Sequence, residues 1–285
     1  MPTQIEWTEE TWEIVQGCTP VSEGCRNCWA ERLARTRLKR FYPEGFGEVV
    51  LRHDQRDKPL HWRKPRKVFV CSRSDLFHEA APYSCIRDAF TVMMMCGGGR
   101  PRDVVAGPHT FQVLTKRPDR MLEFAIRHNL FKRMRAPEPR PWPTNVWAGV
   151  SVENQEWADK RLPLLAQVPA RVRFVSLEPL LGPVDLRPWL SRDDGDGHCT
   201  RCGELREEGH ECPPGSGLPL SWVIVGGESG PNARPMEVEW LADVVAQCRE
   251  AGVPVFVKQD SGPRPGMQGR IPDELWALKQ YPETE

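Results

Sequence analysis

The chain has 285 residues, and its 39 Lys and Arg side chains balance 39 Asp and Glu side chains, so the formal net charge is zero. Hydrophobic residues make up 39% and charged residues 27% of the sequence, which is the balance of a folded globular protein and excludes a disordered or fibrous one. The neutral balance also excludes a protein that coats polyanions through its overall charge, although local basic stretches can still meet phosphate.

The cysteines are informative because the sequence predicts a reducing compartment. No apolar run approaches the length of a membrane span, and the first residues, MPTQIEWTEE, lack the zones of a signal peptide. We therefore expect a cytoplasmic protein with no membrane partner. The cytosol keeps thiols reduced, so clustered cysteines among the ten present are expected to bind metal or to act in redox chemistry.

The first cluster lies in the stretch GCTPVSEGCRNCWAERLAR, where Cys18, Cys25 and Cys28 have the spacing C-x6-C-x2-C and precede an expected helix. A closed zinc site normally takes four protein ligands, and the next Cys or His along the chain is His53. Three thiolates can instead hold a 4Fe-4S cluster and leave one iron open to a non-protein ligand. The alternatives are a three-cysteine zinc site completed by a ligand from elsewhere in the chain, for example His78, and three unrelated buried thiols.

Six short β-rich runs follow, separated by segments with helical character. The runs are 67–75, 110–118, 145–154, 171–179, 221–230 and 253–260, and the helical segments are 84–95, 119–134, 154–168 and 237–252. Alternating strands and helices predict an α/β fold with parallel strands, in a full or partial (β/α) TIM-like barrel. We expect a single barrel-like domain over 1–285.

Polar residues end each predicted strand, and in a parallel barrel such positions gather at the rim where active sites lie. From them we select Asp75, Glu178, Glu228 and Lys258 as candidate catalytic residues, with a purely structural network of ion pairs as the alternative. The sequence GGESG gives four candidate cofactor-binding residues, for which an ordinary tight turn is the alternative. They are Gly226, Gly227, Glu228 and Ser229.

Basic residues also flank two of the predicted strands. They are predicted either to attract the phosphates of a nucleotide or nucleic acid or simply to form a solvated charged face. These residues are Arg63, Lys64, Arg66 and Lys67 before one strand, and Lys116, Arg117 and Arg120 after the next.

The segment 191–218 interrupts the alternation, because it is rich in charge, glycine and proline and shows no strand or helix period. It is predicted to be an insertion that binds a structural zinc ion, since Cys and His are ligands that tetrahedral zinc prefers and metal binding would supply folding energy. His198 competes for the histidine position, and a redox-active C-x2-C is the alternative. The predicted zinc ligands are Cys199, Cys202, His210 and Cys212.

An open iron on a loop at the start of a (β/α) barrel is the arrangement of radical S-adenosylmethionine enzymes. The chain also resembles a phage-derived protein family of undefined function that is viewed as radical-S-adenosylmethionine-like. The resemblance covers nearly the whole chain outside 191–218 and rests on seven blocks. They are IEWTEETWEIVQGCTPVSEGCRNCWAERLA, VFVCSRSDLFH, VLTKRPDRM, WAGVSVEN, RFVSLEPLLGPV, WVIVGGESGPNARPM and VPVFVKQ.

This resemblance implies that Cys18, Cys25 and Cys28 hold the cluster, in a bacterial or phage-infected cell, often beside a three-Cys-motif partner protein. The usual radical pattern is C-x3-C-x2-C with an aromatic residue just before the last cysteine. Here the first gap is six residues, and the aromatic residue is Trp29, just after the last cysteine. The resemblance therefore bears more directly on the cluster than on the reaction.

Together these observations predict an iron-sulfur (4Fe-4S) enzyme that uses S-adenosyl-L-methionine and an electron donor to modify a nucleic acid or nucleotide. The alternative is a metal-stabilised module that binds nucleic acid or protein without catalysis. Zinc hydrolysis is disfavoured because the sequence contains no H-E-x-x-H or similar motif that carries a base.

Overall fold

The structure is a computed structural model of residues 1–285, and it describes residues 3–97, 108–133, 142–190 and 219–283. The chain forms two compact units, residues 1–149 and 150–285, and each is described by itself. The predicted zinc ligands in 191–218 lie outside the described residues.

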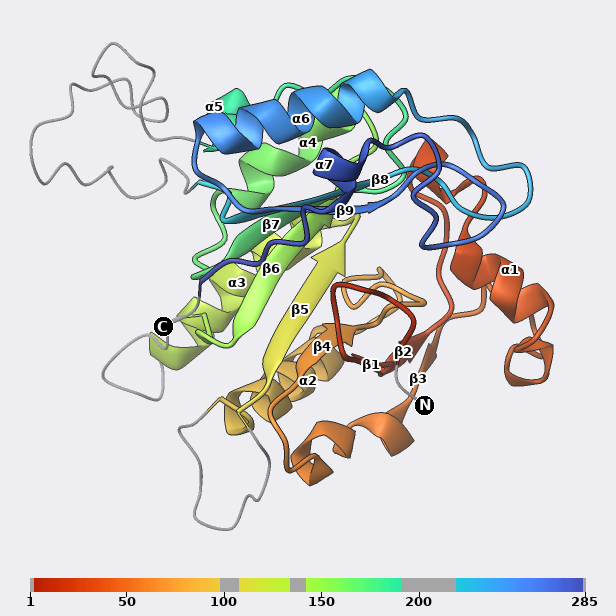
Figure 1. The fold of residues 1–285 in the computed structure, drawn as a ribbon. Helices are drawn as coiled ribbons and strands as arrows, with labels where there is room; N and C mark the ends of the chain where they lie inside the picture. The colour runs from red at the N-terminus through yellow and green to blue at the C-terminus, as the bar shows by residue number, and fades with distance from the viewer. Residues whose placement is uncertain (1–2, 98–107, 134–141, 191–218, 284–285) are drawn as a thin grey trace, which may run out of the picture. The chain divides into compact units, whose positions relative to one another are not determined.

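The strands β1, β4, β5, β6, β7, β8 and β9 form a seven-stranded sheet in that order. The pairs β1/β4, β4/β5, β7/β8 and β8/β9 are parallel. The fold is therefore α/β with a parallel sheet and agrees with the predicted partial (β/α) barrel (Figure 1). A parallel pair needs a crossover connection, which explains the helices between successive strands.

The first unit contains the N-terminal strand, a small two-stranded sheet and the cysteine loop. Strand β2 pairs with β3 in this antiparallel sheet, and α1 follows the cysteines as predicted. In this unit the elements are β1 (Glu10–Trp12), β2 (Val15–Gln16), η1 (Glu23–Cys25), α1 (Trp29–Arg35), η2 (Lys39–Phe41), β3 (Val50–Leu51), η3 (His53–Gln55), η4 (Lys58–His61), β4 (Lys67–Val70), α2 (Tyr83–Met95), β5 (Thr110–Thr115) and α3 (Pro118–Arg133).

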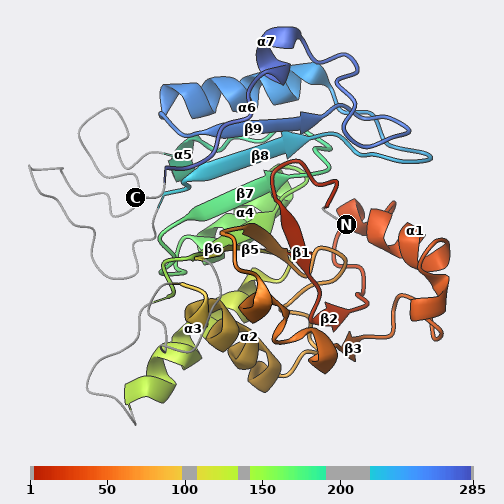
Figure 2. The same cartoon turned by 60° about the horizontal axis from the view of Figure 1, so that its bottom comes forward.

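The second unit carries the later strands, and the views agree that α6 runs along β8 and β9 (Figures 1 and 2). Strands β7 and β8 are buried along their whole length, as the apolar runs RFVSL and WVIV predict for strands covered on both faces. Strand β6 begins in the first unit and ends in the second. From this strand to the C-terminus the elements are β6 (Val146–Ser151), α4 (Gln155–Leu165), β7 (Arg173–Leu177), α5 (Arg187–Leu190), β8 (Trp222–Gly226), α6 (Val238–Glu250), β9 (Val255–Gln259) and α7 (Asp273–Trp276).

All six strands and all four helical segments predicted from the sequence are present, and only their ends differ. The helix predicted to end near Gly252 ends at Glu250, and Gly252 has a φ of 64°, the left-handed conformation typical just after a helix. Strand β1 is an addition that the sequence did not predict. Within the described ranges, no helix is long and apolar enough to cross a membrane.

A buried ion pair stabilises the loop that follows β6. Arg161 and Glu153 are almost completely buried, and Arg161 Nη1 donates to Glu153 Oε2 at 2.9 Å and to the carbonyl of Ser151 at 2.7 Å. The guanidinium also stacks on Trp157, 4.1 Å from the ring centroid. Glu153 ends one of the predicted strands, and its carboxylate is used here to neutralise a buried cation.

Replacing Arg161 by leucine leaves the Glu153 carboxylate buried without its cation. We expect Arg161→Leu to lower the free energy of unfolding by about 3–5 kcal/mol, measured by urea titration. The control is Arg187→Leu, because the Arg187 side chain is 54% exposed and its pair with Asp185 should contribute less than about 1 kcal/mol. Equal losses for the two variants would contradict this role of the buried pair.

Candidate metal centre

The three clustered cysteines lie on one loop between β2 and the first helix. Cys18 follows β2, Cys25 ends η1, and Cys28 is the N-cap residue of α1. All three are partly buried and none is in a disulfide. The amide of Cys28 donates to the carbonyl of Cys25 at 3.2 Å, so the C-x2-C segment forms a tight turn as its spacing predicts.

The start of this loop is fixed by a close backbone approach at Gly17. Gly17 has a φ of 88°, and a Cβ at this position would lie 2.1 Å from the carbonyl oxygen of Glu48. The next amide, that of Cys18, donates to the carbonyl of Phe46 at 2.9 Å. Only glycine fits both the conformation and the space, so the position of Cys18 depends on it.

A buried guanidinium clamps the cysteine loop to the ends of the neighbouring strands. Arg117, just after β5, is 3% exposed, and its Nη2 donates to both the carbonyl and the hydroxyl of Thr19 at 3.0 Å. Its Nη1 lies 3.7 Å from the sulfur of Cys18 and 3.2 Å from Asp75 Oδ2. Its Nε donates to Glu79 at 2.9 Å. The cation therefore lies beside a sulfur on which a bound metal would leave negative charge.

The environment of the thiols shows that they lie within electrostatic reach of one another. Burial raises the pKa of the Cys18 thiol to about 11; Asp75 adds to this shift, and Arg117 opposes it. Burial also raises the pKa of Cys28, and a negative charge on Cys25 raises the pKa values of both Cys18 and Cys28. Metal binding at this loop must therefore displace thiol protons, which a soft metal does readily.

His78, the alternative fourth ligand, uses both of its ring nitrogens in hydrogen bonds. Nδ1 accepts from the amide of Ala80 at 3.1 Å, and Nε2 lies 2.9 Å from the hydroxyl of Thr19. Since Nδ1 accepts, the neutral ring carries its proton on Nε2 and donates it to Thr19. Burial lowers the pKa of His78, which agrees with a neutral ring. This arrangement does not favour a zinc ion completed by His78.

A site for a single metal ion needs several ligands around one point. In the part of the chain that the structure describes, no three His, Cys, Asp or Glu side chains are placed to hold one metal ion. An iron-sulfur cluster spreads its thiolates over different irons, so it does not require three sulfurs to converge on one point.

Asp75 lies in the same network as the cysteine loop. Its carboxylate is 4% exposed and accepts hydrogen bonds from the hydroxyl of Thr115 at 2.7 Å and from the amides of Phe77 and Lys116 at 2.9 and 3.1 Å. With Arg117 as a further donor, the carboxylate orients the ends of β4 and β5. In this arrangement its role is to position Arg117.

In the second unit, Glu178 and Lys258 come together from the ends of β7 and β9. Lys258 Nζ lies 2.6 Å from Glu178 Oε1, and the hydroxyl of Ser176 donates to Glu178 Oε2 at 3.1 Å. The Glu178 side chain is 13% exposed and that of Lys258 is 21% exposed. This partly accessible pair has the composition needed to hold or move a proton.

The GGESG segment after β8 is held by its own loop and by the end of β9. Arg234 donates to the Glu228 carboxylate from its amide, from Nε and from Nη2, at 2.9, 3.0 and 2.5 Å. The amide of Gly227 donates to the carbonyl of Gln259 at 2.8 Å, and a Cβ on Gly227 would lie 2.3 Å from the amide nitrogen of Ser261. Ser229 bridges to Gly262. The two glycines thus serve a close approach between neighbouring loops.

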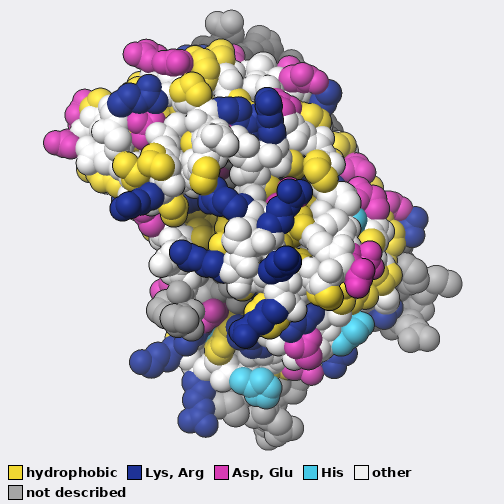
Figure 3. Space-filling model, turned by 90° about the vertical axis from the view of Figure 1, so that its right-hand side faces the viewer, with side chains coloured by type: hydrophobic (Ala, Val, Ile, Leu, Met, Phe, Trp, Pro, Cys, Tyr) yellow, Lys and Arg dark blue, Asp and Glu magenta, His cyan; other side chains and the backbone are white. Residues whose placement is uncertain are grey.

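Two of the three basic residues that follow β5 are held by contacts within the fold. Arg117 is buried as described, and Arg120 donates to the carbonyls of Phe77, His78 and Ala81. Lysine and arginine side chains are numerous on the face that α1 occupies, with acidic side chains among them (Figure 3). The sequence did not show that Arg117 is a clamp, because its partners Thr19, Asp75 and Glu79 lie far from it along the chain.

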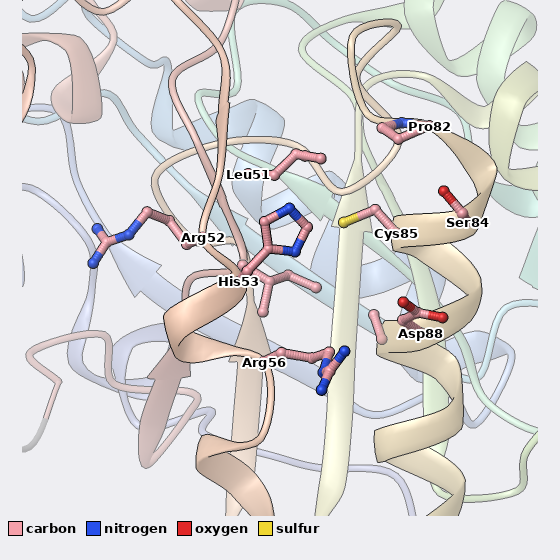
Figure 4. A pocket seen from close by; sticks show the side chains of 10 residues that line it. Leu51, Arg52, His53, Arg56, Pro82, Ser84, Cys85 and Asp88 are labelled. Atoms are coloured by element: carbon pink, nitrogen blue, oxygen red, sulfur yellow. The ribbon is translucent and has the colours of Figure 1, made fainter.

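A small pocket in the first unit lies apart from the predicted site residues. It is formed by η3, α2 and the strand β3, and His53 and Cys85 face one another across it (Figure 4). Burial raises the pKa of Cys85, and Asp88 adds to the shift, so its thiol is not activated as a nucleophile.

Comparison with curated proteins and with solved structures found no match. A family model described as a protein of unknown function (DUF5131) matches residues 2–270, which agrees with the breadth of the resemblance predicted from the sequence. The chain therefore belongs to this family of unknown function.

Proposed function

We propose that the protein is an iron-sulfur (4Fe-4S) enzyme of radical-S-adenosylmethionine-like type that acts on a nucleic acid or nucleotide. The observation that carries the proposal is the loop on which Cys18, Cys25 and Cys28 lie together, partly buried and outside any disulfide. A cytosolic location as predicted from the sequence would keep these thiols available to metal.

The donor set fits such a cluster on three counts. Three soft sulfur ligands come from one short loop, and cysteine thiolates are the usual ligands of iron-sulfur clusters. The guanidinium of Arg117 lies 3.7 Å from the sulfur of Cys18, where it would offset the negative charge of the thiolates. His78, the alternative ligand considered above, is already hydrogen-bonded through both nitrogens. When bound, the cluster would supply one electron to the sulfonium of S-adenosyl-L-methionine held at the open iron.

The protein's own residues have three proposed tasks. Arg117 and Asp75 hold the cysteine loop in place. Glu178 and Lys258 hold or exchange a proton with a polar group of the substrate or of S-adenosyl-L-methionine. The segment from Gly226 to Ser229 keeps its proposed role in cofactor binding through its backbone, because the Glu228 carboxylate is occupied by Arg234.

Three further components belong to the proposal. A low-potential electron donor would reduce the cluster, and a three-Cys-motif protein is a candidate partner. A structural zinc ion would be held by Cys199, Cys202, His210 and Cys212.

A second candidate function is a metal-stabilised module that binds nucleic acid or protein without catalysis. Asp75 and Glu228, two of the predicted catalytic carboxylates, favour it because each accepts several hydrogen bonds from its own surroundings. The two functions differ in one measurable product, 5′-deoxyadenosine.

Metal content tests the proposed cluster. We expect anaerobically purified protein to contain about four irons and four sulfides per chain, with the visible absorption of a 4Fe-4S cluster. Cys18→Ala, Cys25→Ala and Cys28→Ala should each remove most of the iron, because each takes away one of only three ligands.

Cys85→Ala is the matched control, since Cys85 is also a partly buried free thiol but lies on α2. It should leave the iron content unchanged. Zinc bound at this loop without sulfide, or iron that survives all three substitutions, would overturn the proposed cluster.

Formation of 5′-deoxyadenosine from S-adenosyl-L-methionine under reducing conditions tests catalysis. We expect Glu178→Gln and Lys258→Met each to lower its rate about 100-fold, because a small misplacement of the bound cofactor or substrate can cost that much. Iron content should stay at the level of the unsubstituted protein, which separates this effect from loss of the cluster.

Arg187→Gln, an exposed cation in the same unit, serves as the control and should leave the rate unchanged. A full cluster without 5′-deoxyadenosine in the unsubstituted protein would favour the non-catalytic module.

A further inference from the structure

A short basic segment stands out in a chain of zero net charge. From Arg26 to Tyr42 the sequence contains six cations and a single carboxylate, that of Glu31. The segment starts within the cysteine loop and continues through α1 and η2. We call it the basic segment.

Two of the six cations have ordinary structural explanations. Arg32 and Arg35 lie in the last turn of α1, where positive charge is favourable beside the helix C-terminus. Arg35 also pairs with Glu31 at 2.5 Å, one turn away on the helix. The remaining four lie outside the helix, so neither explanation applies to them.

Three of these cations lie past the helix end and have no carboxylate beside them. Arg37, Lys39 and Arg40 are exposed, and none forms an ion pair with any residue that the structure describes. Arg26, between Cys25 and Cys28, is likewise exposed. Neighbouring cations without a carboxylate beside them repel one another, and the binding of an anion relieves this repulsion.

Exposed aromatic side chains accompany these cations. Phe41 is 46% exposed and Trp29 is 38% exposed, and they are among only five large apolar side chains that are exposed in the described ranges. The guanidinium of Arg40 lies 4.7 Å from the centroid of the Phe41 ring. Val50, 44% exposed, lies on β3 and pairs with Gln16 of β2.

The backbone holds Phe41 in its exposed position. The amide of Leu38 donates to the carbonyl of Leu33 at 2.9 Å, and the amide of Phe41 donates to the carbonyl of Leu38 at 2.8 Å. The side-chain amide of Gln16, on β2, donates to the carbonyl of Phe41 at 2.5 Å. The aromatic ring is thus presented on a hydrogen-bonded turn, so little ordering is needed before it can contact a ligand.

We propose that the basic segment binds single-stranded nucleic acid, with Arg37, Lys39 and Arg40 at the phosphates and Phe41 stacked against a base. Unpaired cations beside exposed aromatic rings match the two features that single strands offer, a charged backbone and accessible base faces. Bases in a duplex are stacked on one another and do not expose such faces, so a single strand is the favoured ligand.

The segment also begins at the proposed cluster. Cys28 caps the helix that leads to these residues, so a strand bound along α1 and η2 would lie on the same short stretch of chain as the cysteines. In treating this strand as the substrate, the inference rests on the proposed function, whereas binding itself does not depend on a cluster.

Fluorescence anisotropy with labelled single-stranded RNA and DNA of mixed sequence tests the proposal on the full chain. We expect Arg37→Ala/Lys39→Ala to reduce the slope of log affinity against log salt by about 1.4, since each of the two lost phosphate contacts contributes about 0.7. Phe41→Ala should weaken binding about 5- to 150-fold, the range for loss of one stacked base.

Arg56→Ala/Lys58→Ala is the matched control, because it also removes one exposed arginine and one exposed lysine from the first unit. It should leave the salt slope unchanged. Equal effects of the two double variants, no binding of single strands, or tighter binding to a duplex or to vesicles of anionic phospholipid would each overturn the proposal.

Iron content measured on the same samples separates this inference from the proposed function. Binding of single strands by a protein that contains no iron would support the nucleic-acid-binding segment and contradict the proposed cluster. A full cluster without any binding of single strands would support the cluster and contradict the binding segment.

Discussion

The buried guanidinium of Arg117 is the interaction on which the candidate site depends. A cation that is 3% exposed is costly unless every part of it is paired, and here Asp75, Glu79 and Thr19 provide those partners. The partners come from different places in the sequence, so the charge can be satisfied only when the cysteine loop, the end of β4 and the end of β5 are all in place. The requirement to neutralise one charge thereby fixes where Cys18 lies.

This dependence explains which features could be predicted from the sequence and which could not. The strands β7 and β8 were predictable because a run such as WVIV, flanked by polar residues, fits only a strand buried on both faces. Strand β1 has three residues and a polar composition, so its pairing with β4 is decided by the sheet beside it and not by its own pattern. The segment TKRPDR suggests exposed charge, and nothing local shows that its first arginine is enclosed by a loop from about a hundred residues earlier.

The contacts of the predicted rim residues also could not be predicted from the sequence. Their positions at strand ends were correctly predicted, since parallel strands must end there, but their partners were not. Glu228 is held by Arg234, six residues further on, and Glu153 by Arg161, eight residues further on; both pairs close local loops. Glu178 instead meets Lys258, which lies on a strand two places away in the sheet, and the pair remains partly accessible. The exposure of the carboxylate, which is greater for Glu178 than for Glu228 or Glu153, is what distinguishes a candidate for chemistry from a structural contact.

The cysteine loop connects a buried cation with carboxylate partners to a segment of exposed cations without them. Their closeness along the chain supports a common role. On one side, Cys18 is held beside a cation whose carboxylate partners leave it little freedom, which suits a rigid ligand to a metal. On the other side, Cys28 begins a helix that leads to Arg37, Lys39 and Arg40, which are exposed and have no carboxylate partners among the described residues. An exposed aromatic ring, that of Phe41, follows them. A chain that neutralises its buried charges so completely has no structural need for uncompensated cations within fifteen residues of the proposed cluster. The position of these cations is explained if the anion that binds them is the substrate of the proposed cluster.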